Sequence, residues 1–112
     1  MKMKIYFGKK SFEVEVKRTG LAGKIRGLMF RGRRTENLLF ENCEGISLHS
    51  WFVFFDFLVL WLDEKNRVLD ARLVGPFEFY VKSDKKFQSI VEIPINLKNK
   101  KIVEFFVEKR KI

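Results

Sequence analysis

The polar side chains best suited to chemistry gather around one long apolar segment in the middle of the chain. The stretch HSWFVFFDFLVLWL, residues 49–62, opens on the single histidine and carries one carboxylate at position 56. An imidazole or a carboxylate among apolar neighbours is costly unless it has a hydrogen-bonding or ionic partner. Two arginines before the stretch are candidate partners, because a guanidinium group fits carboxylates and phosphates. The ligand-binding candidates are therefore Arg26, Arg31, His49, Ser50 and Asp56.

Each of these candidates also has a purely structural interpretation, which stays open. His49 can be a hydrogen-bonded residue at the start of a strand. Asp56 can face solvent at a bend between two strands. The arginines can form the solvated flank of a helix, with Arg33 and Arg34 continuing the basic cluster.

The sequence contains none of the common enzyme signatures. One histidine cannot supply a two-histidine metal site or an HExxH motif, and no GxGxxG, Walker or GxSxG sequence occurs. Cys43 and His49 could form a thiol–imidazole pair, but no third group orients them, so a buried structural thiol is the expectation. A hydrolase built on His49 and Asp56 would lack a nucleophile. We expect no catalytic residue, no metal and no cofactor.

Length and composition indicate a single basic domain over residues 1–112. The net charge of +9 can attract nucleic acid or anionic ligands, but a solvated lysine-rich surface, common in proteins from heat-loving organisms, explains it as well. One cysteine excludes an internal disulfide and is typical of a reducing compartment. No signal peptide is visible, so we predict a cytoplasmic protein.

Short strands and turns dominate the rest of the chain. A hairpin is predicted within residues 3–16, and strands at 37–40, 67–74, 77–81, 89–95 and 102–110. Apolar residues spaced three and four apart favour one short helix near residues 20–30. About eight or nine short strands are typical of an all-β, mainly antiparallel fold, a compact jelly-roll-like sandwich or barrel.

The apolar stretch raises the question of a membrane span. A helix over residues 46–62 would be at the lower limit of length, and Asp56 near the bilayer midplane would cost about 2.5–3.5 kcal/mol. Its Phe, Val and Trp residues favour strands instead, so we predict two buried strands that bend around residues 54–56 and no membrane association.

Both faces of these two strands carry aromatic residues, so both faces must be covered. We expect the sheet core on one side and a second copy of the chain on the other, which predicts a homodimer. The interface candidates are Trp51, Phe55, Phe57 and Trp61.

Several short segments occur in an order that resembles the domain of unknown function 192 family, also called uncharacterised protein family UPF 0127. They are RGLMFR (26–31), LLF (38–40), LHSWF (48–52), Leu62-Asp63, VLDARLVGPF (68–77) and VEIP (91–94). The resemblance implies a compact, jelly-roll-like β-sandwich and no established activity.

The chain departs from the family pattern at three places. Val53 stands where the family usually has Met, and the Pro-Ile-Asp segment falls on Asp56, Phe57 and Leu58, so the aspartate is displaced. Ile95 and Asn96 replace a glycine after VEIP. We expect a non-catalytic ligand-binding or protein-interaction module; the alternative is a nucleic-acid or anionic-ligand binder that uses the arginine cluster.

Overall fold

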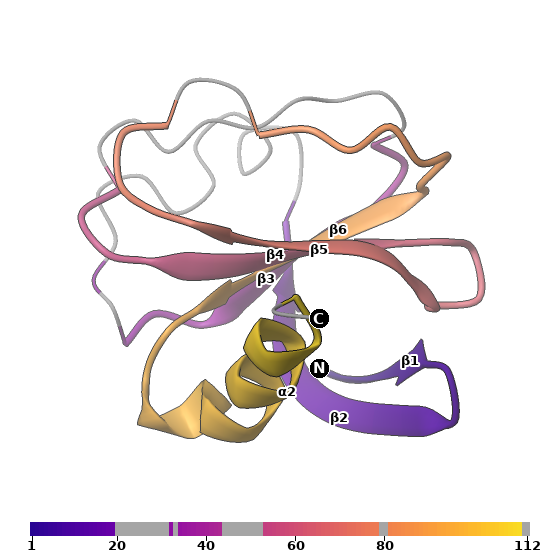
Figure 1. The fold of residues 1–112 in the computed structure, drawn as a ribbon, viewed down its shortest axis with the longest axis horizontal. Helices are drawn as coiled ribbons and strands as arrows, with labels where there is room; N and C mark the ends of the chain where they lie inside the picture. The colour runs from indigo at the N-terminus through magenta and orange to yellow at the C-terminus, as the bar shows by residue number, and fades with distance from the viewer. Residues whose placement is uncertain (20–31, 33, 44–52, 79–80, 111–112) are drawn as a thin grey trace.

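The computed structural model describes residues 1–19, 32, 34–43, 53–78 and 81–110, which form a curled β-sheet and a C-terminal helix (Figure 1). The elements, in chain order, are β1 (Lys2–Phe7), β2 (Lys10–Arg18), β3 (Asn37–Phe40), β4 (Phe57–Leu62), β5 (Val68–Val74), β6 (Ser89–Pro94), the 3-10 turn η1 (Leu97–Asn99) and α2 (Lys100–Arg110).

The strands form one mixed sheet in the order β1-β2-β3-β6-β4-β5. The pair β2–β3 is parallel, whereas the other neighbouring pairs are antiparallel. The sheet curls into a half-barrel, so that its two edge strands approach each other where the amide of Tyr6 donates to the carbonyl of Asn66 at 2.9 Å. Helix α2 lies between the β1–β2 hairpin and the β4–β5 side of the curl (Figure 1).

The inner face of the sheet, which α2 covers, holds one hydrophobic core. Alternate residues of β1, β2, β4 and β6 point into it, as the period of two along a strand requires. Helix α2 contributes Ile102, Val103 and Phe106, and the rings of Phe7 and Phe12 pack against Phe106. Burial of the helix therefore closes the mouth of the half-barrel.

The outer face holds a second core, formed with segments of the same chain. Phe57, Val59 and Trp61 of β4 pack there against residues from two connecting segments. These residues are Cys43, Val53, Phe55, Val81 and Phe87. Strand β4 is buried at all six positions, which explains why its sequence does not alternate.

This second core corrects the predicted role of the interface candidates. Phe55, Phe57 and Trp61 are buried inside a single chain, so they do not offer a free surface to a second copy. Trp51 lies outside the described residues. The continuous apolar sequence needs two layers of cover, and connecting segments supply the second layer on their own.

The expectation of a mainly β chain is confirmed, as are the N-terminal hairpin and the strands near 37–40, 67–74 and 89–95. Of the two strands expected in the apolar stretch, the described residues contain β4, preceded by an irregular segment over 53–56. The sheet is mixed, because β2–β3 is parallel while the other neighbouring pairs are antiparallel as expected. The helix expected near 20–30 lies outside the described residues.

One predicted strand is wrong, and another is described only in part. Residues 102–110 belong to α2, because Ile102, Val103 and Phe106 lie on one side of a helix and bury together. The described part of 77–81 is not a regular strand, since Phe77 has a left-handed backbone with φ of 60°. The Glu78 carboxylate accepts a hydrogen bond from the Gly75 amide at 2.7 Å, which holds this turn.

No helix among the described residues has the length and hydrophobicity that crossing a membrane requires.

Candidate functional site

Of the predicted ligand-binding residues, the structure describes Asp56 alone. Its side chain is exposed, immediately before β4, and its backbone carbonyl accepts a hydrogen bond from the Ile95 amide at 3.2 Å. Arg26, Arg31, His49 and Ser50 lie outside the described residues. Asp56 therefore has the solvent-facing position that was the structural alternative for it.

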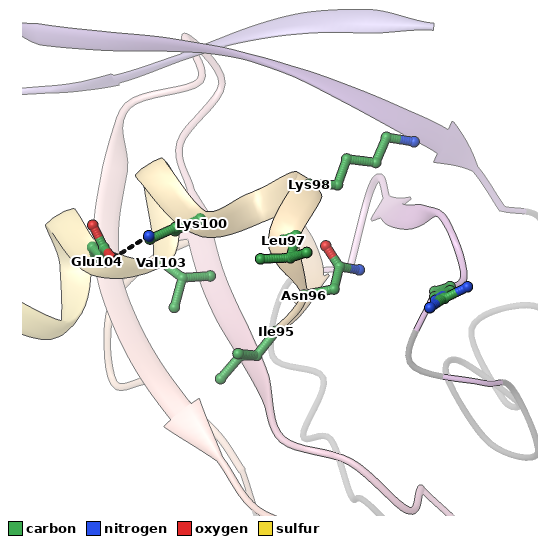
Figure 2. A pocket seen from close by; sticks show the side chains of 8 residues that line it. Ile95, Asn96, Leu97, Lys98, Lys100, Val103 and Glu104 are labelled. Carbon is green, nitrogen blue, oxygen red and sulfur yellow. Dashed lines mark ion pairs between the residues drawn. The ribbon is translucent and has the colours of Figure 1, made fainter.

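Two hollows flank η1, at the point where the chain leaves β6 and enters α2. We call the two hollows together the η1 groove. The hollow on one side has a volume of about 660 Å³ and the hollow on the other about 600 Å³. The first is lined by Arg34, Ile95, Asn96, Leu97, Lys98, Lys100, Val103 and Glu104 (Figure 2).

Two buried asparagines hold η1 in place. The side chains of Asn37 and Asn99 bond reciprocally, with N···O distances of 3.2 and 2.9 Å. Asn99 also donates to the carbonyl of Pro94 at 2.7 Å, and Asn37 donates to the carbonyl of Glu15 at 2.9 Å. Because buried amides need such partners, this pair ties η1 to the end of β6, the start of β3 and the interior of β2.

The first residues of the turn are also fixed locally. The side chain of Asn96 accepts a hydrogen bond from the Asn99 amide at 3.1 Å, which caps the start of η1. Leu97 is 90% exposed at the tip. The side chains of Ile95, Leu97 and Val103 supply the apolar part of the first hollow (Figure 2).

The charge around the groove is mainly positive. Arg34, Lys98 and Lys101 form no ion pair with any residue that the structure describes. Lys98 also lines a third hollow, of about 320 Å³, beside β2. Lys100 is 3.9 Å from Glu104, but both side chains are largely exposed, so the pair neutralises little of the surrounding field.

The groove joins an apolar lining to Arg34 and Lys98, which form no ion pair with a described residue, and this combination suits a molecule with an anionic group and an apolar part. The sequence prediction missed it for a clear reason. Because the sequence pattern predicts a strand over residues 102–110, Val103 was not expected to share one surface with Lys98 and Lys100.

The outer face of the sheet contains a second set of polar groups. Glu92 of β6 is buried opposite Val59, and the indole nitrogen of Trp61 has no hydrogen-bond partner among the described residues. Near them, Asp70 accepts from Ser83 at 2.8 Å and Arg72 pairs with Glu78 at 2.5 Å. The alternating pattern of β6 predicts that Glu92 faces solvent. The sequence therefore gave no indication that this carboxylate is buried.

The β4–β5 turn is organised by one carboxylate. Asp63 accepts hydrogen bonds from the amides of Lys65 and Arg67, both at 2.9 Å, and from the Arg67 guanidinium at 2.6 Å. Burial by itself would raise the pKa of Asp63. The hydrogen bonds from Arg67 and Lys65, together with the Arg67 charge, outweigh burial and lower that pKa below its ordinary value.

Metal chemistry finds no support in the described part of the chain, where no three His, Cys, Asp or Glu side chains cluster suitably for an ion.

Comparison with known proteins identifies a similar fold but does not identify an activity. No family model matches the chain, and no curated protein matches it. Among solved structures, a protein of unknown function from Novosphingobium aromaticivorans is similar, with a TM-score of 0.66 and 18% sequence identity. The match covers 91% of this chain and 77% of that one. At this identity the likeness shows a shared fold alone.

Proposed function

We propose that the protein is a non-catalytic binding module that takes a small anion with an apolar part in the η1 groove. The observation that carries the proposal is the hollow of about 660 Å³, with Ile95, Leu97 and Val103 beside Arg34 and Lys98. Pockets of roughly 300–1,000 Å³ are typical of small-molecule sites.

The electrostatics favour an anion over a neutral ligand. The net charge of +9 raises the concentration of anions near the whole surface, and Lys98 has no described counter-ion to displace. A carboxylate, sulfonate or phosphate that reaches Lys98 and Arg34 gains charge-assisted hydrogen bonds. Its apolar part covers Leu97, which is otherwise exposed to water.

Fluorescence titration with 8-anilinonaphthalene-1-sulfonate tests the proposal, with octanoate as the competitor. Both probes carry one anionic group on an apolar body. We expect enhanced fluorescence that octanoate reverses and that weakens at high salt. Lys98→Glu should raise the dissociation constants of both probes about tenfold or more, because it replaces an attractive contact with a repulsive one.

The matched control is Lys9→Glu, which changes the net charge equally. Lys9 is exposed in the β1–β2 turn and lines none of the three hollows. The proposal predicts a small change for this variant. Absence of saturable binding, or equal weakening by Lys9→Glu and Lys98→Glu, would contradict it.

The second candidate function is nucleic-acid binding through the arginine cluster over residues 26–34. The observation that favours it is that Arg34 lines the same hollow as Lys98 and Lys100. A mixed-sequence oligonucleotide should then bind with an affinity that falls steeply as salt rises. No binding at low salt would end this alternative.

We also propose, from the ordered motifs RGLMFR, LHSWF and VEIP, that the chain is a divergent member of the domain of unknown function 192 family. Membership implies the jelly-roll-like sandwich named above. A cytoplasmic location remains a prediction from the sequence.

A further inference from the structure

Among the described residues, strand β5 forms an open edge of the sheet. It pairs with β4 on one side, and its other side meets β1 only at the Tyr6–Arg67 bridge, just before the strand begins. The backbone amide of Ala71 donates a hydrogen bond to the side chain of the preceding residue, Asp70, at 2.9 Å. This N–H therefore points away from β4. From Asp70 onward, the outer backbone groups of β5 pair with no other described strand.

An open edge is a template for adding another strand. The sequence of β5 at this edge is self-complementary. In an antiparallel arrangement about a two-fold axis, residue i of one copy faces residue j of the other, and j faces i. With the axis at Ala71, Asp70 faces Arg72 of a second copy, and Arg72 faces its Asp70. Opposite charges across neighbouring strands stabilise such a pair, whereas like charges destabilise it.

The neighbouring contacts agree with this arrangement. Asp70 and Arg72 lie on the outer face, each held by a residue of the following segment, Ser83 and Glu78. Pairing would join these two contacts into one network across the axis. On the inner face, Leu73 is 38% exposed at the edge. A register shift between Trp61 and Leu62 brings Val68 to the inner face, within reach of Leu73 of the second copy.

An exposed aromatic pair lies at the end of the same edge. Phe54 and Phe77 are 61% and 53% exposed, and their rings meet edge-to-face at 5.6 Å. Phe77 has a left-handed backbone, a conformation that costs free energy in a bulky residue and often marks a functional surface. Antiparallel pairing brings the partner's β4–β5 turn, with its exposed Arg67, toward this pair.

We propose that the open edge of β5 is a docking surface for a second copy of this chain, joined by antiparallel pairing centred on Ala71. The proposal is independent of ligand binding in the η1 groove. It also differs from the interface expected over residues 51–62, whose described aromatic residues are buried within one chain.

Sedimentation velocity over a range of concentrations, with charge-reversal variants, tests the proposal. The parent chain should show concentration-dependent dimers. Arg72→Asp and Asp70→Arg should each weaken the dimer by about tenfold or more, because each places like charges opposite one another twice. The double swap should restore it, although neither Ser83 nor Glu78 then meets its original partner.

Ala71→Pro gives a second test. Proline removes the outward N–H without removing a bond to β4, so the variant should fold and remain monomeric. Lys4→Asp is the matched control, because Lys4 faces Glu13 within the β1–β2 hairpin and is not part of the proposed pairing. A monomer at all concentrations, or a dimer that neither reversal weakens and Ala71→Pro leaves intact, would overturn the proposal.

Discussion

A single carboxylate accounts for much of the order in the β4–β5 turn. The pKa of Asp63 is lower in the folded chain than in the unfolded one, so its ionised form stabilises the fold. That contribution is complete above the unfolded pKa of about 3.9 and is lost as the pH falls through the lower folded value. The pH dependence of stability therefore reports directly on these hydrogen bonds.

We expect Asp63→Asn to lower the free energy of unfolding by about 1–2 kcal/mol at neutral pH, because an uncharged acceptor replaces an ionised one. Urea denaturation should show that the difference from the parent chain shrinks below pH about 4. Glu64→Gln, at an exposed neighbouring position, should change stability by less than about 0.5 kcal/mol. A difference that is constant down to acid pH would contradict the assignment.

The amide pair Asn37–Asn99 is the residue-scale feature on which the η1 groove depends. Each alanine substitution leaves the other buried amide with fewer partners, which should cost about 1–3 kcal/mol. Because the two side chains act on each other, the double variant should cost less than the sum of the two single variants. Additive effects in denaturation measurements would show that the reciprocal bonds contribute little.

At the scale of elements, α2 is where sequence and structure differ most. Its β-branched and aromatic residues favour a strand, and glutamates at 104 and 108 look like the exposed positions of an alternating pattern. The contacts of Ile102, Val103 and Phe106 with the inner core override that local preference. Propensity alone cannot reveal this, because the partners come from β1, β2 and β4.

The two secondary structures make opposite predictions for adjacent phenylalanines. In α2, Phe106 is buried and Phe105 is half-buried, whereas a strand with Glu104 and Glu108 in solvent would expose Phe106 and bury Phe105. Phe106→Ala should therefore cost about 3–5 kcal/mol of unfolding free energy, and more than Phe105→Ala. The reverse order in thermal or urea denaturation would support a strand.

Strand β4 shows which part of a strand's environment its sequence pattern predicts and which part it does not. Its unbroken apolar run correctly predicts that both faces are covered. The identity of the second cover depends on where the distant residues Val81 and Phe87 return, and no local pattern encodes that. The same limit applies to the η1 groove, where only the tertiary fold brings Arg34 and Lys98 to the lining of one hollow.

At the scale of the whole molecule, the structure shows where part of the positive charge lies. Cations without described counter-ions meet an apolar hollow beside η1, at the junction of the sheet and α2. From the sequence, an anionic partner bound by the arginine cluster was the alternative function, and Arg34 is the described member of that cluster at this site. The tertiary fold is what places Arg34 at the same hollow as Leu97 and Lys98.

The most direct test is an NMR titration of the isotope-labelled protein with octanoate, following every backbone amide. Our account predicts saturable shifts concentrated at residues 95–104 and at Arg34, and their loss in the Lys98→Glu variant but not in Lys9→Glu. Shifts that do not saturate, or that concentrate on another surface such as the β5 edge, would contradict binding in the η1 groove.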